Sequence, residues 1–233
     1  MHRLFVSEPI LGTDYEIKNL NLVKQLTSVL RMNHGARLVL FDNTGFEFES
    51  EINKIEKNKI SLKILNKKQG IGFDRKIGIA ISLLKKDNLE WVVQKSVELG
   101  VCDIYLILSE RCVKNEVSQA QVKRLEEIII EAVEQSEGAL IPKLHELVKY
   151  DKFVKNLDKK KTYLIAAERR STKTLDKFGN NDQIVYLVGP EGGYSDKEVI
   201  LAQEFGIIPV SLGQRILRAE TAAIAGLARL ILK

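Results

Sequence analysis

The stretches LVGPEGGYSDKEV (187–199) and LGQRILRAETA (212–222) decide the expected fold of this chain. In each, an apolar run typical of a β-strand ends in a loop with glycine, and the pattern of a helix follows. Loops of this kind meet at one edge of a sheet when their strands run parallel. The two stretches therefore predict a small-molecule site at that edge.

The first loop is rich in residues that let backbone N–H groups approach a ligand. Three glycines can take positive φ and carry no Cβ: Gly189, Gly192 and Gly193. Pro190 stiffens the turn, and Ser195 with Glu198 forms a capping box that starts the next helix. An anion or polar ligand is expected there, although a glycine turn can equally be structural. The loop lacks both the P-loop and the G-x-G-x-x-G pattern, which argues against a nucleotide site.

The second loop mixes apolar and basic residues. Leu212 ends a strand and Gly213 permits the turn, while Ile216 and Leu217 can either wall an adenine-sized pocket or belong to the core. Two arginines, Arg215 and Arg218, add positive charge beside them.

The helix expected from about Arg218 is rich in small residues, so its backbone can pack close to a neighbour. Glu220, in its first turn, can favour the helix dipole, hold Arg218 or act in catalysis.

Composition describes a globular protein of 233 residues with 45% apolar side chains and a net charge of +5. No secretory h-region and no run of eighteen apolar residues occurs, so we expect a cytoplasmic protein. Cys102 and Cys112 form no C-x-x-C pair and the histidines are scattered, so no metal site is expected. Residues 1–72 hold 11 basic and 8 acidic side chains, an excess compatible with a nucleic-acid surface.

The pattern along the chain changes near residue 72. Strand and hairpin signals occupy 38–65, one helix is expected over 20–32, and 69–72 has the composition of a linker. After it, strands alternate with helices. We therefore expect a small β-barrel domain over 1–72, and over 73–233 an α/β domain with a mostly parallel sheet.

The expected elements after residue 72 follow this alternation. Strands are predicted over 77–84, 104–108, 162–167, 184–188 and 207–212, and helices over 87–99, 118–136, 195–205 and 218–230.

At these residues the chain resembles the ribosomal RNA small subunit methyltransferase E family, of the SPOUT class of S-adenosylmethionine-dependent methyltransferases. The two glycine loops are similar to its cofactor-binding signature. Supporting stretches cover nearly the whole chain in order: HRLFV (2–6), VLRMNHGARLVLFD (29–42), KDNLEWVVQKSVELGV (86–101), LSERCV (108–113) and EAVEQS (131–136). The chain departs from the family pattern at Glu137-Gly138, where Gly-Arg is frequent, and at Gln25, where histidine is frequent.

The resemblance implies a PUA-like RNA-binding domain over 1–72 and a SPOUT methyltransferase domain with a trefoil knot over 73–233. It also implies a homodimer that binds S-adenosyl-L-methionine without a metal. The implied cofactor-binding residues are Leu164, Gly189, Pro190, Glu191, Gly192, Gly193, Leu212, Gly213, Ile216 and Leu217.

The implied reaction is methylation of N3 of a uridine in 16S ribosomal RNA, within the small subunit. Loss of the N3 proton is needed, so Arg218 is expected to stabilise the uridine anion and Glu191 or Glu220 to accept the proton. Expected RNA contacts are Arg3, Arg31, Arg37, Arg111 and Arg215. The alternatives are a SPOUT methyltransferase acting on tRNA or another rRNA site, and a non-catalytic RNA-binding ribosome-assembly factor.

Overall fold

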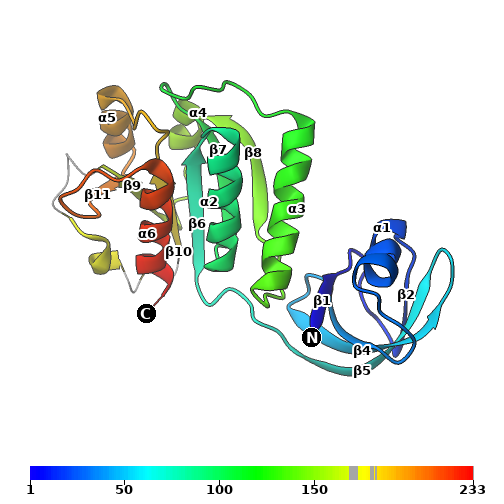
Figure 1. Cartoon of the computed structure of the whole chain (residues 1–233). Helices are drawn as coiled ribbons and strands as arrows, with labels where there is room; N and C mark the ends of the chain where they lie inside the picture. Colours follow the sequence, from blue (N-terminus) through cyan, green and yellow to red (C-terminus); the bar gives the residue numbers. More distant parts are fainter. Residues whose placement is uncertain (168–172, 179–180, 182, 233) are drawn as a thin grey trace. The chain divides into compact units, whose positions relative to one another are not determined.

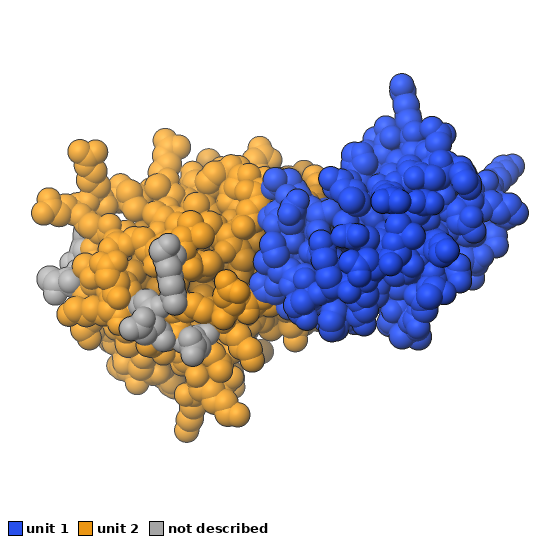
Figure 2. Space-filling view, turned by 90° about the horizontal axis from the view of Figure 1, so that it is seen from below, with its two compact units in different colours: residues 1–72, 133–141 blue, residues 73–132, 142–233 orange. Residues whose placement is uncertain are grey.

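A computed structural model describes residues 1–167, 173–178, 181 and 183–232. The chain forms two compact units, coloured separately in Figure 2. The first unit contains residues 1–72 together with 133–141, and the second contains 73–132 and 142–233. The domains expected from the sequence, 1–72 and 73–233, assign residues 133–141 to the second domain, whereas in the structure these residues pack in the first unit.

The first unit is built on a five-stranded mixed sheet in the order β1-β3-β4-β5-β2. Its strands are β1 (His2–Phe5), β2 (Asp14–Ile17), β3 (Arg37–Phe41), β4 (Phe46–Ile55) and β5 (Ile60–Gln69). β1 pairs parallel with β3, and the other pairs are antiparallel. The hairpin signals near residues 38–65 are thus confirmed, although the β4–β5 hairpin extends further and β1 and β2 were not expected.

The helix expected over 20–32 is shorter than its apolar pattern indicates. Helix α1 (Leu20–Lys24) is capped by the Asn19 side chain, and a π-helical turn, η1 (Gln25–Val29), follows it. The chain then leaves the helix at Arg31, whose φ is 50°. Buried side chains from this helix and the sheet, including Leu26, form the core of the unit.

The first unit also takes up the segment that has a linker-like composition. Ile71 forms a bridge to Gly138, and Gly70 lies so close to Ala139 that an added Cβ would come within 2.3 Å of the alanine Cβ. Residues 69–72 are therefore packed structure within this unit.

The second unit contains a six-stranded sheet in the order β11-β9-β10-β6-β7-β8, and every strand pair in it is parallel. The strands are β6 (Lys76–Ser82), β7 (Asp103–Leu108), β8 (Lys143–Lys149), β9 (Thr162–Ala166), β10 (Gln183–Val188) and β11 (Ile208–Val210). The helices are α2 (Lys86–Glu98), α3 (Gln119–Gln135), α4 (Tyr150–Lys155), α5 (Asp196–Glu204) and α6 (Ala219–Ile231), with a short 3-10 turn η2 (Leu175–Phe178). The α/β class expected from the sequence is confirmed.

Helices cover both faces of this parallel sheet (Figure 1). Helix α6 contacts β10, β6 and α2 on one face, while α4 and α5 contact each other and pack on strands of the other face. The side chains of β10 alternate accordingly: Val185 and Leu187 join a core cluster with Val199 of α5, and Tyr186 faces α6.

Two elements of the second unit, β8 and α4, were not predicted from the sequence. Strand β8 lies at a sheet edge and carries charged or half-buried side chains, so it lacks the apolar run of a central strand. Helix α4 follows it directly and is too short to show helical periodicity.

The expected cap of α2 at Asp87 or Asn88 is wrong, since the helix begins after Lys85.

The strand order places a topological switch at β6. From β6 the chain proceeds outward to β7 and β8, whereas β10, on its other side, arrives much later in sequence. Crevices at such switch points, outside the carboxyl ends of the strands, are where open α/β sheets bind ligands.

Candidate ligand pocket and basic groups

A pocket of about 600 Å³ lies at the carboxyl edge of the sheet in the second unit. It is formed at the ends of β9 and β10, by the loop that follows β10 and by the start of α6. Its volume is within the range of ligand sites, roughly 300–1,000 Å³. The small-molecule site expected from the two glycine loops therefore has a physical counterpart.

Seven of the ten residues expected to hold a cofactor line this pocket: Gly189, Pro190, Glu191, Gly192, Gly193, Ile216 and Leu217. The other three lie outside its lining. Leu164 is fully buried in β9, and Leu212 and Gly213 precede the part of the second loop that reaches the pocket. Ala166, Ala167, Tyr194 and Asp196 line it as well, which the sequence did not indicate.

The glycines shape the first loop by the space they leave. A Cβ on Gly189 would lie 3.0 Å from the backbone nitrogen of Tyr194, closer than side chains normally approach. Gly193 has φ +66° and its N–H donates to the carbonyl of Pro190 at 2.8 Å, which closes a tight turn. The loop thus exposes backbone to the pocket.

The capping box predicted at the start of α5 is confirmed. The Ser195 side chain accepts from the Glu198 N–H at 3.3 Å, and Glu198 Oε2 accepts from the Ser195 N–H at 2.8 Å. The loop therefore enters the helix at a defined angle.

Two tyrosines, the partly buried Tyr194 and the buried Tyr150, make hydrogen bonds in and beside this loop. Ser82 Oγ donates to the hydroxyl of Tyr194 at 3.4 Å, and burial raises the pKa of Tyr194 well above its ordinary value. Tyr150 donates to the Glu198 carbonyl at 2.9 Å, and burial likewise raises the pKa of Tyr150. Both tyrosines stay protonated and act as neutral donors or acceptors.

The candidate base Glu191 has a backbone partner. Its Oε1 accepts from the N–H of Lys85, the N-cap residue of α2, at 3.1 Å. A carboxylate at a helix N-terminus is stabilised by the helix dipole. Glu191 therefore joins the pocket loop to α2.

Arg218 and Glu220 lie where the second loop becomes α6. Arg218 is the N-cap residue and its exposed side chain makes no capping bond. Glu220 Oε2 is buried and has no hydrogen-bond partner among the described residues. Neither side chain lines the pocket, but their neighbours Leu217 and Ala219 do.

The five arginines expected to contact RNA lie in different surroundings. Arg111 lines the pocket, and Arg215 is exposed in the second loop. In the first unit, Arg31 is exposed, and Arg37 is exposed and donates from Nε to Glu51 Oε2 at 3.2 Å.

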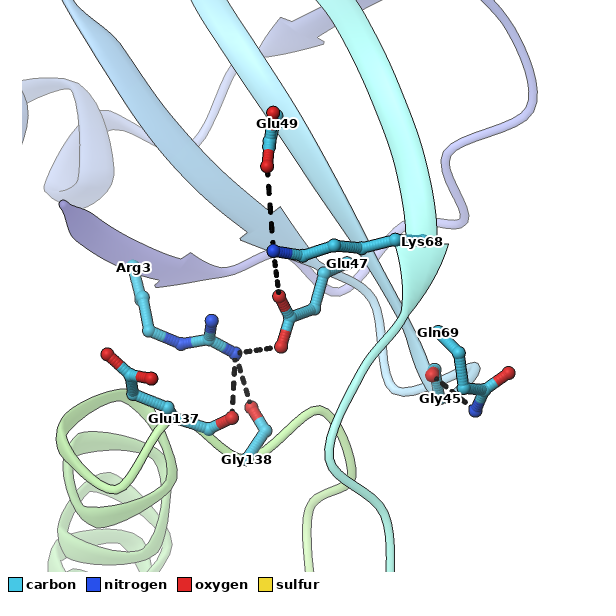
Figure 3. Close-up of polar contacts among 8 residues, drawn as sticks. All are labelled: Arg3, Gly45, Glu47, Glu49, Lys68, Gln69, Glu137 and Gly138. Carbon is cyan, nitrogen blue, oxygen red and sulfur yellow. Dashed lines mark hydrogen bonds and ion pairs between the residues drawn. The ribbon is translucent and has the colours of Figure 1, made fainter.

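Arg3 is held by its own unit (Figure 3). Its side chain is 8% exposed, pairs with Glu47 at 3.0 Å and donates to the carbonyls of Glu137 and Gly138. These bonds give Arg3 a structural role in fastening 137–138 to the sheet, while its expected RNA contact stays a prediction.

Within the described part of the chain, no group of three His, Cys, Asp or Glu side chains is placed to hold a metal ion. The described helices also include none long and apolar enough to cross a membrane.

Family models match both parts of the chain. The model described as an RNA methyltransferase domain matches residues 73–231, and that of an RNA methyltransferase PUA domain matches residues 26–65. The parallel sheet with its pocket therefore lies in an RNA methyltransferase domain.

Individual relatives narrow this class. The ribosomal RNA small subunit methyltransferase E of Buchnera aphidicola subsp. Schizaphis graminum is 32% identical over 213 residues, covering 89% of this chain and 86% of the relative. That of Rickettsia conorii is 28% identical over 232 residues, covering 98% and 94%. The crystal structure of the Neisseria gonorrhoeae protein of this name bound to S-adenosyl methionine matches with a TM-score of 0.90 and 32% identity, covering 98% and 95%. The chain belongs to the ribosomal RNA small subunit methyltransferase E family.

Proposed function

We propose that this protein uses S-adenosyl-L-methionine to methylate N3 of a uridine in 16S ribosomal RNA of the small subunit. The observation that carries the proposal is the pocket built jointly by the two glycine loops at the carboxyl edge of the parallel sheet, in a chain of this family. The S-adenosyl methionine in the Neisseria gonorrhoeae structure supports the choice of cofactor.

The pocket fits the cofactor in size and in chemistry. Backbone groups of 189–193 offer polar contacts, and Ile216 and Leu217 offer an apolar wall for the adenine. Ile216 is 69% exposed, which suits a residue that closes over a bound ligand. Leu164 of β9, and Leu212 and Gly213 of the second loop, complete the proposed binding set.

When bound, S-adenosylmethionine supplies a methyl group activated by its sulfonium charge. The chain has to orient the uridine, hold it away from water and remove its N3 proton. Arg218, exposed and without a capping bond, is the proposed partner of the uridine anion. Glu191 or Glu220 accepts the proton, directly or through water.

The two candidate bases differ in their present partners. Glu191 already binds the Lys85 N–H, whereas Glu220 keeps one buried oxygen without a partner among the described residues. Replacing each by glutamine and recording the rate against pH distinguishes them: only the base should remove the acidic limb of the profile and lower kcat at fixed KM.

RNA is proposed to bind residues 1–72, as expected of a PUA-like domain, as well as the methyltransferase domain 73–233. Arg31 and Arg37 are exposed in the first region, and Arg111 and Arg215 in the second. Arg3, already paired with Glu47, completes the proposed set. A knotted second domain, a homodimer and a cytoplasmic location belong to the same proposal.

Mapping the modified nucleoside tests the function. Small subunits from a strain lacking the gene are incubated with the protein and the cofactor, and 16S rRNA is then analysed by primer extension. An N3-methylated uridine cannot form its Watson–Crick pair, so reverse transcriptase should stop at one site. Methyl transfer to tRNA or to another rRNA position would contradict the proposed 16S rRNA substrate.

The Arg218→Ala variant tests the proposed role of Arg218 in stabilising the uridine anion. It should still bind the cofactor but transfer methyl groups on the order of 100-fold more slowly, the usual cost of losing one charge-stabilising donor. A wild-type rate would remove Arg218 from the mechanism.

A further inference from the structure

Glu198 links two loops at the carboxyl edge of the sheet. Its Oε2 accepts from the N–H of Ser195, and its Oε1 accepts from the N–H of Glu110, both at 2.8 Å. The residue is only 8% exposed. A buried carboxylate whose two oxygens both receive backbone amides holds those amides firmly, because charge-assisted hydrogen bonds are stronger than neutral ones.

Two further bonds join the same loops. Ser195 Oγ donates to Glu110 Oε2 at 2.7 Å, and Arg111 Nη1 donates to the carbonyl of Gly192 at 2.9 Å. The dipeptide 110–111, which follows β7, is thus bonded to the loop and helix start that follow β10. A capping box alone needs none of these bonds across the sheet edge.

These bonds bring the Arg111 side chain to the pocket wall. A Cβ on Gly192 would lie 3.3 Å from Arg111 Cβ, so the arginine passes directly over the glycine. An arginine guanidinium has five N–H donors. Among the described residues, the Arg111 guanidinium uses one of them, in the bond to the Gly192 carbonyl. The remaining N–H donors of Arg111 are available to an anionic oxygen group at the pocket.

We propose that Glu198 is a positioning residue that holds Arg111 at the pocket, where the guanidinium binds an anionic oxygen group. This inference rests on the proposed function, which brings two such groups to the pocket: an RNA phosphate and the carboxylate of the cofactor. Glu198 itself is buried behind the loop and acts through Arg111.

A double-mutant cycle tests the coupling. Affinities for 16S rRNA and for S-adenosylmethionine are measured separately on Arg111→Ala, Glu198→Gln and the double variant. Arg111→Ala should weaken one ligand about 10-fold, and Glu198→Gln should weaken the same ligand about 3- to 10-fold. In the Arg111→Ala background, Glu198→Gln should add less than about twofold, because its effect requires the arginine.

The cycle also identifies the anion. Loss of rRNA affinity assigns the phosphate, and loss of cofactor affinity assigns the carboxylate. The matched control is Glu204→Gln, which removes an equal charge from an exposed position of the same helix and should change neither affinity. Additive effects, or unchanged affinities in Glu198→Gln, would overturn the proposal.

Hydrogen exchange separates failure of this inference from failure of the proposed function. In Glu198→Ala the Glu110 amide should exchange at least about 10-fold faster than in wild type, and in Glu204→Ala it should not. Unchanged exchange at Glu110 would show that Glu198 does not hold the loop, whatever the enzyme methylates. A wild-type protein that leaves rRNA unmodified would instead contradict the proposed substrate, while exchange and cofactor affinity still decide the role of Glu198.

Discussion

Glu137 shows how a single backbone conformation can conflict with its residue type. It has φ +61°, in the left-handed region that glycine tolerates and other residues adopt at a cost. Its carbonyl and that of Gly138 accept hydrogen bonds from the Arg3 guanidinium (Figure 3). Arg3 is itself held by a buried ion pair with Glu47, so these bonds fix the conformation of Glu137. Glycine would adopt this φ without that cost, because it has no Cβ.

We therefore expect Glu137→Gly to raise the free energy of unfolding by about 0.5–1 kcal/mol, since the strain relieved exceeds the added entropy of the unfolded chain. Denaturant unfolding measures the change. Glu137→Ala removes the same carboxylate but keeps a Cβ, so it should bring no gain. Equal stabilisation by both variants would show that charge, and not φ, is responsible.

Asp103 carries a second residue-scale prediction. Its carboxylate contacts His145 Nε2 at 2.7 Å and Lys161 Nζ at 3.3 Å. The hydrogen bond with His145, aided by Lys161 and opposed by burial, lowers the pKa of Asp103 from 3.8 to about 2. The folded protein therefore binds fewer protons here than the unfolded chain does.

The stabilisation from Asp103 is complete above about pH 4 and is lost as the pH falls from there towards 2. Asp103→Asn should thus be less stable at neutral pH and should lose less stability than wild type across that acid range. Unfolding measured from pH 5 to pH 2 tests this. Asp151→Asn, from an exposed pair with Lys155, is the control that should follow wild type. Parallel curves for Asp103→Asn and wild type would contradict the prediction.

At the scale of elements, the packing of α6 on β10 depends on one missing methyl group. A Cβ on Gly226 would lie 2.4–2.7 Å from three atoms of the Tyr186 ring and hydroxyl. Tyr186 is fully buried and its hydroxyl donates to the Ala222 carbonyl at 3.3 Å, so it has little room to move. The small-residue face of the last helix is therefore used for close approach, as expected from its composition.

Gly226→Ala should lower the free energy of unfolding by about 1–3 kcal/mol through overpacking, although alanine is the better helix former. Thermal unfolding measures the loss. Tyr186→Phe on the Gly226→Ala background should restore little, because ring carbons make the closest contacts. A stabilised Gly226→Ala protein would mean that α6 can shift away from β10.

At the scale of the whole molecule, the proposed cofactor should stabilise the fold. A ligand that binds only the native state at 100 times its Kd adds about 2.7 kcal/mol. For a chain of this size that corresponds to a rise in Tm of several degrees, on the order of 2–4 °C per kcal/mol. A thermal-shift titration with S-adenosylmethionine measures it, with ATP as the control that shares the adenosine. No shift at saturating cofactor would favour a non-catalytic RNA-binding factor.

The predictable parts of this molecule are those whose interactions are local in sequence. The capping box joins Ser195 and Glu198, which are three positions apart. The left-handed Gly100 follows α2, a helix that the apolar period of the sequence predicts. The edge strand β8 lacks such a local signal, because half of its surroundings are solvent and its side chains are correspondingly mixed.

The sequence by itself determined the α/β class, the two glycine loops and the family, because strand and helix periods and short motifs are properties of neighbouring residues. Only the tertiary structure decided the strand order, the return of 133–141 to the first unit, and the bonds from Arg3 to Glu137 and from Glu198 to Glu110. Those contacts join residues 134 and 88 positions apart. Their partners are chosen by the path of the chain through space, which no local pattern records.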